Sequence, residues 1–177
     1  MELICHPDTP PTRVEGVAVE LTMTDGDDML LTYSVKGSEH LLLPGWKSSA
    51  RRDELWRTTC FELFLRSEGQ DAYVEFNFSP STEWAAYSFA GYRDGMREWP
   101  CAVDPFVERG GEGEGFVVEA DVDLGGTAEG PLRLGFSAVI EERDGTTSYW
   151  ALAHPPGKPD FHHPACFAFE LPAPEAS

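Results

Sequence analysis

Basic residues are scarce in this chain of 177 residues, which has 13 Lys and Arg against 31 Asp and Glu and a formal net charge of -18. Nucleic-acid backbones and anionic membranes repel such a chain, so we expect neither as a partner. Apolar runs are short, and none approaches the roughly 20 residues that cross a bilayer. The start, Met1 to His6, lacks the basic and apolar stretches of a signal peptide, which predicts a cytoplasmic protein.

Cysteine is also sparse, and its four positions show no CxxC spacing: Cys5, Cys60, Cys101 and Cys166. This pattern predicts buried thiols and neither a disulfide framework nor a zinc site. Nucleophile elbows, P-loops and Rossmann glycine patterns are absent, so we expect no catalytic residue and no cofactor. The many acids leave a bound calcium open, although no calcium-loop spacing occurs.

Glycine and proline, at 17 and 14 residues, favour short strands joined by turns over helices. Strand-like segments are 2–6, 14–24, 29–36, 58–66, 72–79, 84–91, 103–109, 115–123, 133–142, 148–151 and 166–171. Turn signals lie at 25–27, 36–38, 110–113 and 144–145, and a short turn is expected at 125–129. We predict an all-β fold: a single antiparallel β-sandwich of jelly-roll type over residues 1–172, with ten or eleven strands and a frayed tail at 173–177. Its exposed edge strands could pair two copies into a homodimer.

The most informative segment is a predicted hairpin over residues 58–79, whose two strands alternate with period two. One face is apolar: Phe61, Leu63, Leu65, Val74, Phe76 and Phe78. The other face carries Glu62, Glu75 and Asn77 together with Cys60, Phe64 and Tyr73. A turn at 67–70 would set Glu62 opposite Glu75 and Cys60 opposite Asn77. A slip of two residues would keep both faces and break that pairing.

Opposed carboxylates are destabilising without compensation, which a shared proton, an arginine, a cation or a polar ligand supplies. We therefore interpret this face as a ligand site. Arg93 is our choice for the neutralising arginine. Trp56 and Trp150 are the tryptophans favoured for stacking, because each lies at a strand end near polar loops. In the proline-rich segment 154–164 we expect Asp160, Phe161 and His162 at the cleft rim; the adjacent pair His162 and His163 is a weak metal signal.

The hairpin and the segment 159–164 carry a family resemblance. Their residues are Leu55-Trp56, Cys60-Phe61-Glu62-Leu63-Phe64-Leu65, Tyr73-Val74-Glu75-Phe76-Asn77-Phe78-Ser79-Pro80 and Pro159-Asp160-Phe161-His162-His163-Pro164. The chain resembles the DOMON-like superfamily, in particular its branch similar to family 9 carbohydrate-binding modules. The resemblance implies a jelly-roll sandwich with a cleft on one sheet, where tryptophans sandwich a sugar; Trp56 and Glu62 match the family's first tryptophan and its glutamate. Other DOMON members resemble haem modules, for which Met23, Met29 or Met96 with His6 or His162 are axial candidates.

These observations predict a non-catalytic domain that binds a small ligand, most simply a sugar or glycan fragment. Trp56 and Trp150 would stack on it, and Glu62, Glu75, Asn77, Tyr73, Arg93 and His162 would supply the polar contacts. Three alternatives stay open: a haem-binding electron-transfer module, a small glycoside-active enzyme and a protein-interaction scaffold.

Overall fold

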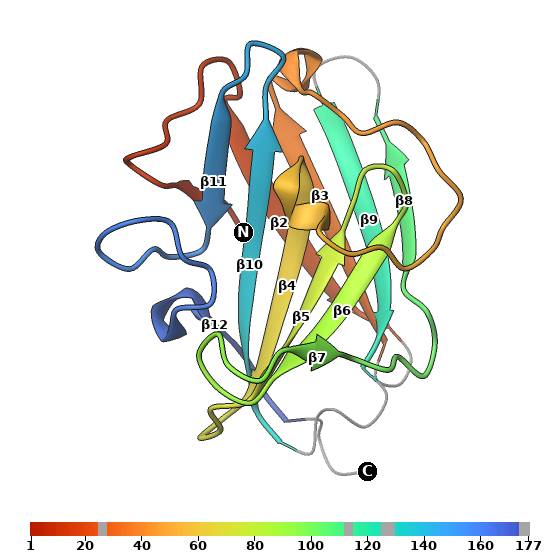
Figure 1. The fold of residues 1–177 in the computed structure, drawn as a ribbon, viewed down its shortest axis with the longest axis vertical. Helices are drawn as coiled ribbons and strands as arrows, with labels where there is room; N and C mark the ends of the chain where they lie inside the picture. Colours follow the sequence, from red (N-terminus) through yellow and green to blue (C-terminus); the bar gives the residue numbers. More distant parts are fainter. Residues whose placement is uncertain (25–27, 112–114, 125–129, 174–177) are drawn as a thin grey trace.

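The computed structural model describes residues 1–24, 28–111, 115–124 and 130–173. Within these ranges the chain forms twelve strands and three short 3-10 turns (Figure 1). The strands are β1 (Ile4–Cys5), β2 (Gly16–Met23), β3 (Asp28–Lys36), β4 (Cys60–Ser67), β5 (Tyr73–Phe78), β6 (Trp84–Phe89), β7 (Arg97–Glu98), β8 (Phe106–Gly110), β9 (Gly115–Asp123), β10 (Leu132–Glu141), β11 (Thr147–Ala151) and β12 (Phe169–Leu171). The turns are η1 (Ser38–His40), η2 (Leu55–Arg57) and η3 (Pro164–Cys166).

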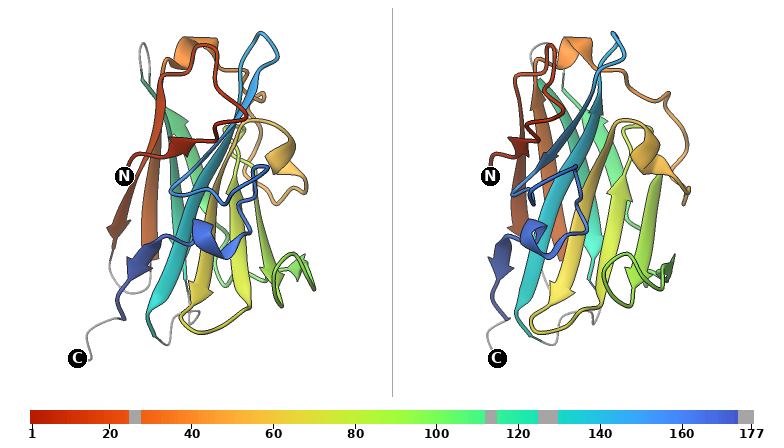
Figure 2. Two further views of the ribbon diagram at one scale, coloured as in Figure 1. Left: turned by 90° about the vertical axis from the view of Figure 1, so that its left-hand side faces the viewer. Right: turned by 60° about the vertical axis from the view of Figure 1, so that its left-hand side comes forward.

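Two antiparallel sheets face each other as layers of a sandwich (Figure 2). The larger sheet has the order β1-β11-β10-β4-β5-β6-β7, with β12 beside β11 along the same edge of β10, and the smaller has the order β2-β3-β9-β8. The predicted β-sandwich is therefore confirmed. Strand β7 was not predicted, because two exposed residues carry no alternation. The predicted turns at 25–27 and 125–129 lie outside the described residues, as do residues 112–114 of the glycine-rich turn and 174–177 of the tail.

Alternation along the smaller sheet shows that only one of its faces is buried. In β3 and β9, buried residues alternate with exposed or half-buried ones over nine positions each. In contrast, the first six residues of β4 are all buried, as are five of the six residues of β5. The larger sheet is thus covered on both sides at its centre, by the smaller sheet on one side and by loops on the other.

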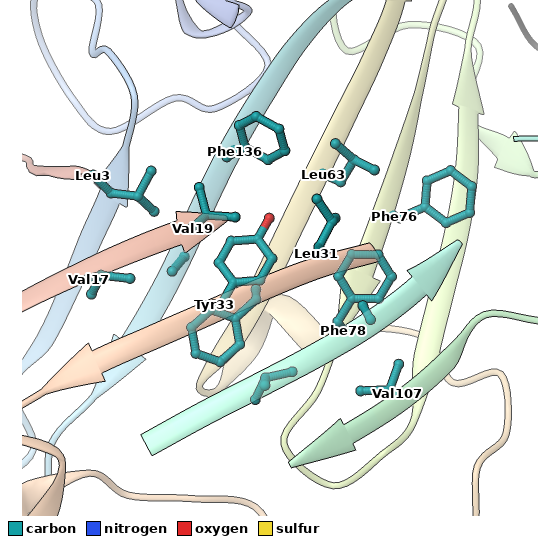
Figure 3. Close-up of a cluster of buried hydrophobic side chains, with 14 of the residues drawn as sticks. Leu3, Val17, Val19, Leu31, Tyr33, Leu63, Phe76, Phe78, Val107 and Phe136 are labelled. Atoms are coloured by element: carbon teal, nitrogen blue, oxygen red, sulfur yellow. The ribbon is translucent and has the colours of Figure 1, made fainter. Parts of the chain in front are cut away.

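The core between the sheets contains the apolar face predicted for the hairpin. Leu63, Phe76 and Phe78 point toward β3 and β9 (Figure 3), and the ring of Phe61 contacts that of Tyr33. Tyr33 of β3 is fully buried there, and its hydroxyl donates a 2.7 Å hydrogen bond to the backbone carbonyl of Glu62. This bond ties the two sheets together directly beneath one of the predicted site residues.

Three segments cover the outer face of the larger sheet. They are η2, the turn between β6 and β7, and the chain from 152 to 168 that carries η3 (Figures 1 and 2). Their apolar side chains meet the sheet in a second buried cluster, which includes Leu55, Phe89, Phe161 and Phe167. Gly135 of β10 permits this approach, because a Cβ there would lie 3.0 Å from the Cys166 carbonyl oxygen.

The register of the β4–β5 hairpin differs from the predicted one by two residues. Glu62 lies opposite Asn77 and Phe64 lies opposite Glu75. The loop is longer than four residues: the ladder ends at the pair Leu65 and Val74, and a turn follows Ser67. The predicted facing pair of Glu62 with Glu75 is wrong, whereas the assignment of both to one face is confirmed.

All four cysteines are free thiols, but only Cys60 and Cys166 are buried, whereas Cys5 and Cys101 are half-buried. Among the described residues, no helix has the length and apolar character needed to span a bilayer.

Replacing Tyr33 with Phe should lower the free energy of unfolding by about 1 kcal/mol, since the change removes one buried hydrogen bond and leaves the cavity nearly filled. Urea denaturation followed by tryptophan fluorescence measures the difference. A Tyr33→Phe variant as stable as the wild type would show that the hydroxyl does not help to hold the sheets together.

Candidate functional site

A pocket of about 350 Å³ opens on the outer face of the larger sheet, enclosed by the three covering segments. This volume lies near the lower end of the range for protein pockets that bind small molecules, which is roughly 300 to 1,000 Å³. The lining residues are Trp56, Glu62, Glu75, Phe89, Arg93, Met96, Val139, Tyr149, Pro159, Phe161 and His162. Five of the eight predicted site residues are among them.

The floor of the pocket is built by cross-strand pairing. Ser137, Glu62, Asn77 and Ala85 follow one another across β10, β4, β5 and β6. Glu75 lies in the neighbouring row, so it is the diagonal neighbour of Glu62, with Cα atoms roughly 7–8 Å apart. In this diagonal arrangement the two carboxyl groups are close enough for the charge of Glu75 to act on Glu62.

Both carboxyl groups are buried, with Glu62 3% and Glu75 5% exposed. The Ser137 hydroxyl donates to Glu62 Oε2 at 2.8 Å, and the Asn77 amide donates to Glu75 Oε1 at 2.7 Å. Burial, followed by the charge of Glu75, raises the pKa of Glu62 to about 8. Burial likewise raises the pKa of Glu75 to about 7, against the opposing effects of Asn77 and Arg93. The pair therefore keeps a proton near neutral pH.

His162 closes the floor at one end and is held neutral. Its Nδ1 lies 2.7 Å from the Tyr73 hydroxyl, and its Nε2 lies 3.7 Å from Glu75 Oε2. Its ring packs edge-on against Phe64 and Phe89. Burial, and then the charge of Arg93, lower the pKa of His162 to about 4, so this imidazole does not offset the carboxylates.

Arg93 links two of the covering segments at the rim. Its guanidinium donates to Asp160 Oδ1 from Nη2 at 2.7 Å and from Nε at 3.1 Å, while the Tyr92 hydroxyl donates to the other oxygen of Asp160. Its backbone N–H donates to the Tyr73 hydroxyl at 3.3 Å. The charge of Arg93 lowers the pKa of both glutamates, but its side-chain hydrogen bonds go to Asp160.

Aromatic rings stand at both sides of the floor. Trp56 of η2 is half-buried and meets Tyr87 of β6 edge-on at 5.8 Å between ring centroids. Tyr149 projects from β11, on the other side of β10, and its ring lies 6.0 Å from that of Phe161. The Tyr87 hydroxyl donates to Asp53 at 2.7 Å, which anchors the segment that carries Trp56.

Trp150 is the one predicted site residue that the structure does not bring near the pocket. It lies in the core between the sheets, 5% exposed, with its indole N–H bonded to Ser148 Oγ. Successive side chains of a strand point to opposite faces, so the neighbouring Tyr149 reaches the pocket instead. Tyr149 could have been identified from the sequence, because it alternates with Trp150 along the same strand.

The other two predicted residues support the pocket without lining it. Asn77 is fully buried and reaches the pocket through Glu75, and Tyr73 does so through His162. Phe161 was expected at the cleft rim, and Met96 was considered only as a haem ligand; the other lining residues were not predicted: Phe89, Val139, Tyr149 and Pro159. Met96, Pro159 and Phe161 come from covering segments, whose position over the sheet depends on long-range contacts, whereas Phe89, Val139 and Tyr149 project from β6, β10 and β11.

The residues do not fit a haem. Of the axial candidates, Met96 and His162 line the same pocket, whereas Met29 is buried in the core and Met23 lies exposed on β2. Both nitrogens of His162 face protein oxygens, and the pocket floor carries two buried carboxyl groups where an apolar macrocycle would lie. Within the described ranges, no three His, Cys, Asp or Glu side chains are grouped so as to hold a metal ion.

No protein-family model matches the sequence, and no curated protein matches it. Solved structures do match the fold. A candidate carbohydrate-binding protein from Bacteroides uniformis is 16% identical over 91% of this chain and 79% of its own, with a TM-score of 0.63. A carbohydrate binding module of family 9 from Caldicellulosiruptor kristjanssonii, in complex with glucose, is 14% identical over 95% of this chain and 81% of its own, with a TM-score of 0.55. A further structure of such a module from that organism, with cellotriose, is 14% identical over 84% and 70%, with a TM-score of 0.51. At these identities the likeness shows a shared sandwich fold.

The raised pKa values of Glu62 and Glu75 predict that stability falls as pH rises. Both glutamates bind a proton more tightly in the folded protein than in the unfolded chain. Their contribution to the free energy of unfolding is therefore complete below the unfolded pKa of 4.5, and it is lost as the pH rises through the folded pKa values of about 7 and 8. Between pH 5 and 7 the loss approaches about 1.4 kcal/mol per pH unit for each carboxyl that keeps its proton. Glu62→Gln mimics the protonated form and should flatten this dependence in urea titrations.

The matched control is Glu20→Gln, which changes an exposed glutamate of β2. The control should follow the wild-type pH dependence. If Glu62→Gln follows it as well, Glu62 is ionised in the folded protein at pH 7 and the shared proton does not exist.

Proposed function

We propose that this chain is a non-catalytic carbohydrate-binding domain whose ligand lies in the pocket above Glu62 and Glu75. One observation carries the proposal: two buried carboxyl groups on a sheet floor lie between aromatic rings in a pocket of about 350 Å³. Sugars present hydroxyl groups at their edges and C–H groups on their faces. A polar floor between flat rings matches both features.

Each lining residue has a role in this arrangement. The ring of Trp56 stacks on the C–H face of the sugar, and Tyr149 and Phe161 bound the opposite side. Glu62 and Glu75 accept hydrogen bonds from hydroxyl groups, and Arg93 donates from the rim. The fold supports the proposal further, because similar sandwiches were solved with glucose and with cellotriose.

A second candidate, glycoside hydrolysis, is favoured by the raised pKa of Glu62, since a general acid must keep its proton near neutral pH. Release of nitrophenol from a panel of nitrophenyl glycosides would support it, provided that Glu62→Gln abolishes the release. The binding proposal expects no release from wild type or variant.

Trp56→Ala should weaken sugar binding at least about tenfold, because the change removes the stacking ring. Titration calorimetry with glucose, cellotriose and a panel of mono- and disaccharides measures the effect. Trp46→Ala is the matched control, since Trp46 is 61% exposed and lies outside this pocket. Equal affinities of wild type and Trp56→Ala would remove Trp56 from the site, and no binding of any sugar to the wild type would overturn the proposed function.

A further inference from the structure

The two floor carboxyl groups receive few hydrogen bonds for their degree of burial. Glu142, a third buried glutamate, accepts three bonds from the backbone N–H groups of residues 12–14, at 2.8, 2.8 and 3.4 Å. Glu62 and Glu75 each accept one bond, through Oε2 and Oε1 respectively. No described residue places a donor within hydrogen-bond distance of Glu62 Oε1, and the group that faces Glu75 Oε2 is His162 Nε2 at 3.7 Å. Two carboxyl oxygens in the pocket, Glu62 Oε1 and Glu75 Oε2, therefore receive no hydrogen bond from the described groups outside the pair.

The charges around the floor do not balance. Arg93 lines the pocket and lowers the pKa of both glutamates, but it is ion-paired with Asp160 at the rim, so its charge offsets the two carboxylates only in part. His162 is neutral at the pH at which the glutamates titrate. When both are ionised, Glu62 and Glu75 therefore give the floor an excess of negative charge, and burial favours retention of a proton by the pair.

We propose, on the basis of the carbohydrate-binding function proposed above, that the ligand is an amino sugar whose protonated amine lies between Glu62 and Glu75. An ammonium group has three donors, so it can bond to Glu62 Oε1 and Glu75 Oε2 together. Its charge lets both carboxylates ionise, which a neutral hydroxyl does not. The rings of Trp56 and Tyr149 suit the sugar face and also attract a cation.

Amine binding would release the proton that the two glutamates hold. The affinity should therefore rise with pH above pH 6, until the ligand's amine loses its own proton. The titratable and charged groups around the pair are Tyr33 on β3, Cys60 on β4, Tyr73 on β5, Tyr87 on β6, Asp53 before η2, Tyr92 and Arg93 in the β6–β7 turn, Tyr149 on β11, and Asp160, His162 and Cys166 in the covering segment. Among the thiol and phenol groups, burial raises the pKa of Cys60, Tyr73, Tyr87 and Cys166, so these stay neutral over this range.

The test is titration calorimetry of the intact protein with matched pairs of sugars: glucose with glucosamine, galactose with galactosamine, and mannose with mannosamine. N-acetylglucosamine serves as the neutral analogue with a blocked amine. Titrations at pH 6 and 7, each in phosphate and in ACES, give the number of protons released from the difference in apparent enthalpy. We expect at least one amino sugar to bind roughly tenfold more tightly than its neutral partner, with proton release.

The variant Glu62→Gln/Glu75→Gln should bring the ratio of the two affinities close to one. Circular dichroism and urea denaturation show whether the variant is folded. If the variant is not folded, the number of protons that the wild type releases on binding an amino sugar tests the proposal by itself.

The outcomes separate the two proposals. Neutral and amino sugars that bind equally, without proton release, would overturn the amino sugar and leave the carbohydrate-binding function. If cyclohexylamine binds and no sugar does, the ligand is a cation, and the proposed carbohydrate-binding function is overturned. Binding of nothing would overturn both. If calcium displaces glucosamine, the carboxyl pair is a metal-ion site, and the proposal that it binds an amine is overturned.

Discussion

The central strands of the larger sheet bury side chains on both faces, so each position in β4 and β5 belongs either to the core or to the layer outside it. The inner face is apolar throughout and packs on β3 and β9. The outer face carries Glu62 and Glu75, which would be ordinary surface acids if the sheet were open to water. Because three segments cover this face, the two carboxyl groups are desolvated, and the electrostatics of the pocket follow from that cover.

The cover is held by polar contacts between its own parts as well as by apolar packing. Arg93 and Asp160 join the β6–β7 turn to the segment before β12, and Tyr73 joins His162 to β5. These bonds satisfy the charges at the rim and leave the floor carboxyl groups without a counter-charge of their own. A polar ligand that enters the pocket therefore meets groups that the protein itself does not satisfy, which is where binding energy is available.

Prediction succeeded where the local pattern was sufficient. Alternation assigned Glu62, Glu75 and Asn77 to one face, and that assignment depends only on the period of a strand. It did not fix the register, because a shift of two residues leaves both faces unchanged and only the turn decides between the alternatives. Trp150 shows a similar limit: a tryptophan at a strand end was compatible with either face, and the structure places it in the core between the sheets.

The sequence by itself determined the class of fold, the apolar and polar faces of the hairpin, and the residue types of the site, because these follow from periodicity and composition. Only the tertiary structure decided that Glu62 and Glu75 are diagonal neighbours, that Tyr149 and Phe161 complete the wall, and that the pair keeps a proton. The physical reason is that burial of a carboxyl group depends on segments distant in the chain, here residues 53–57 and 152–168, which no local pattern positions over the sheet.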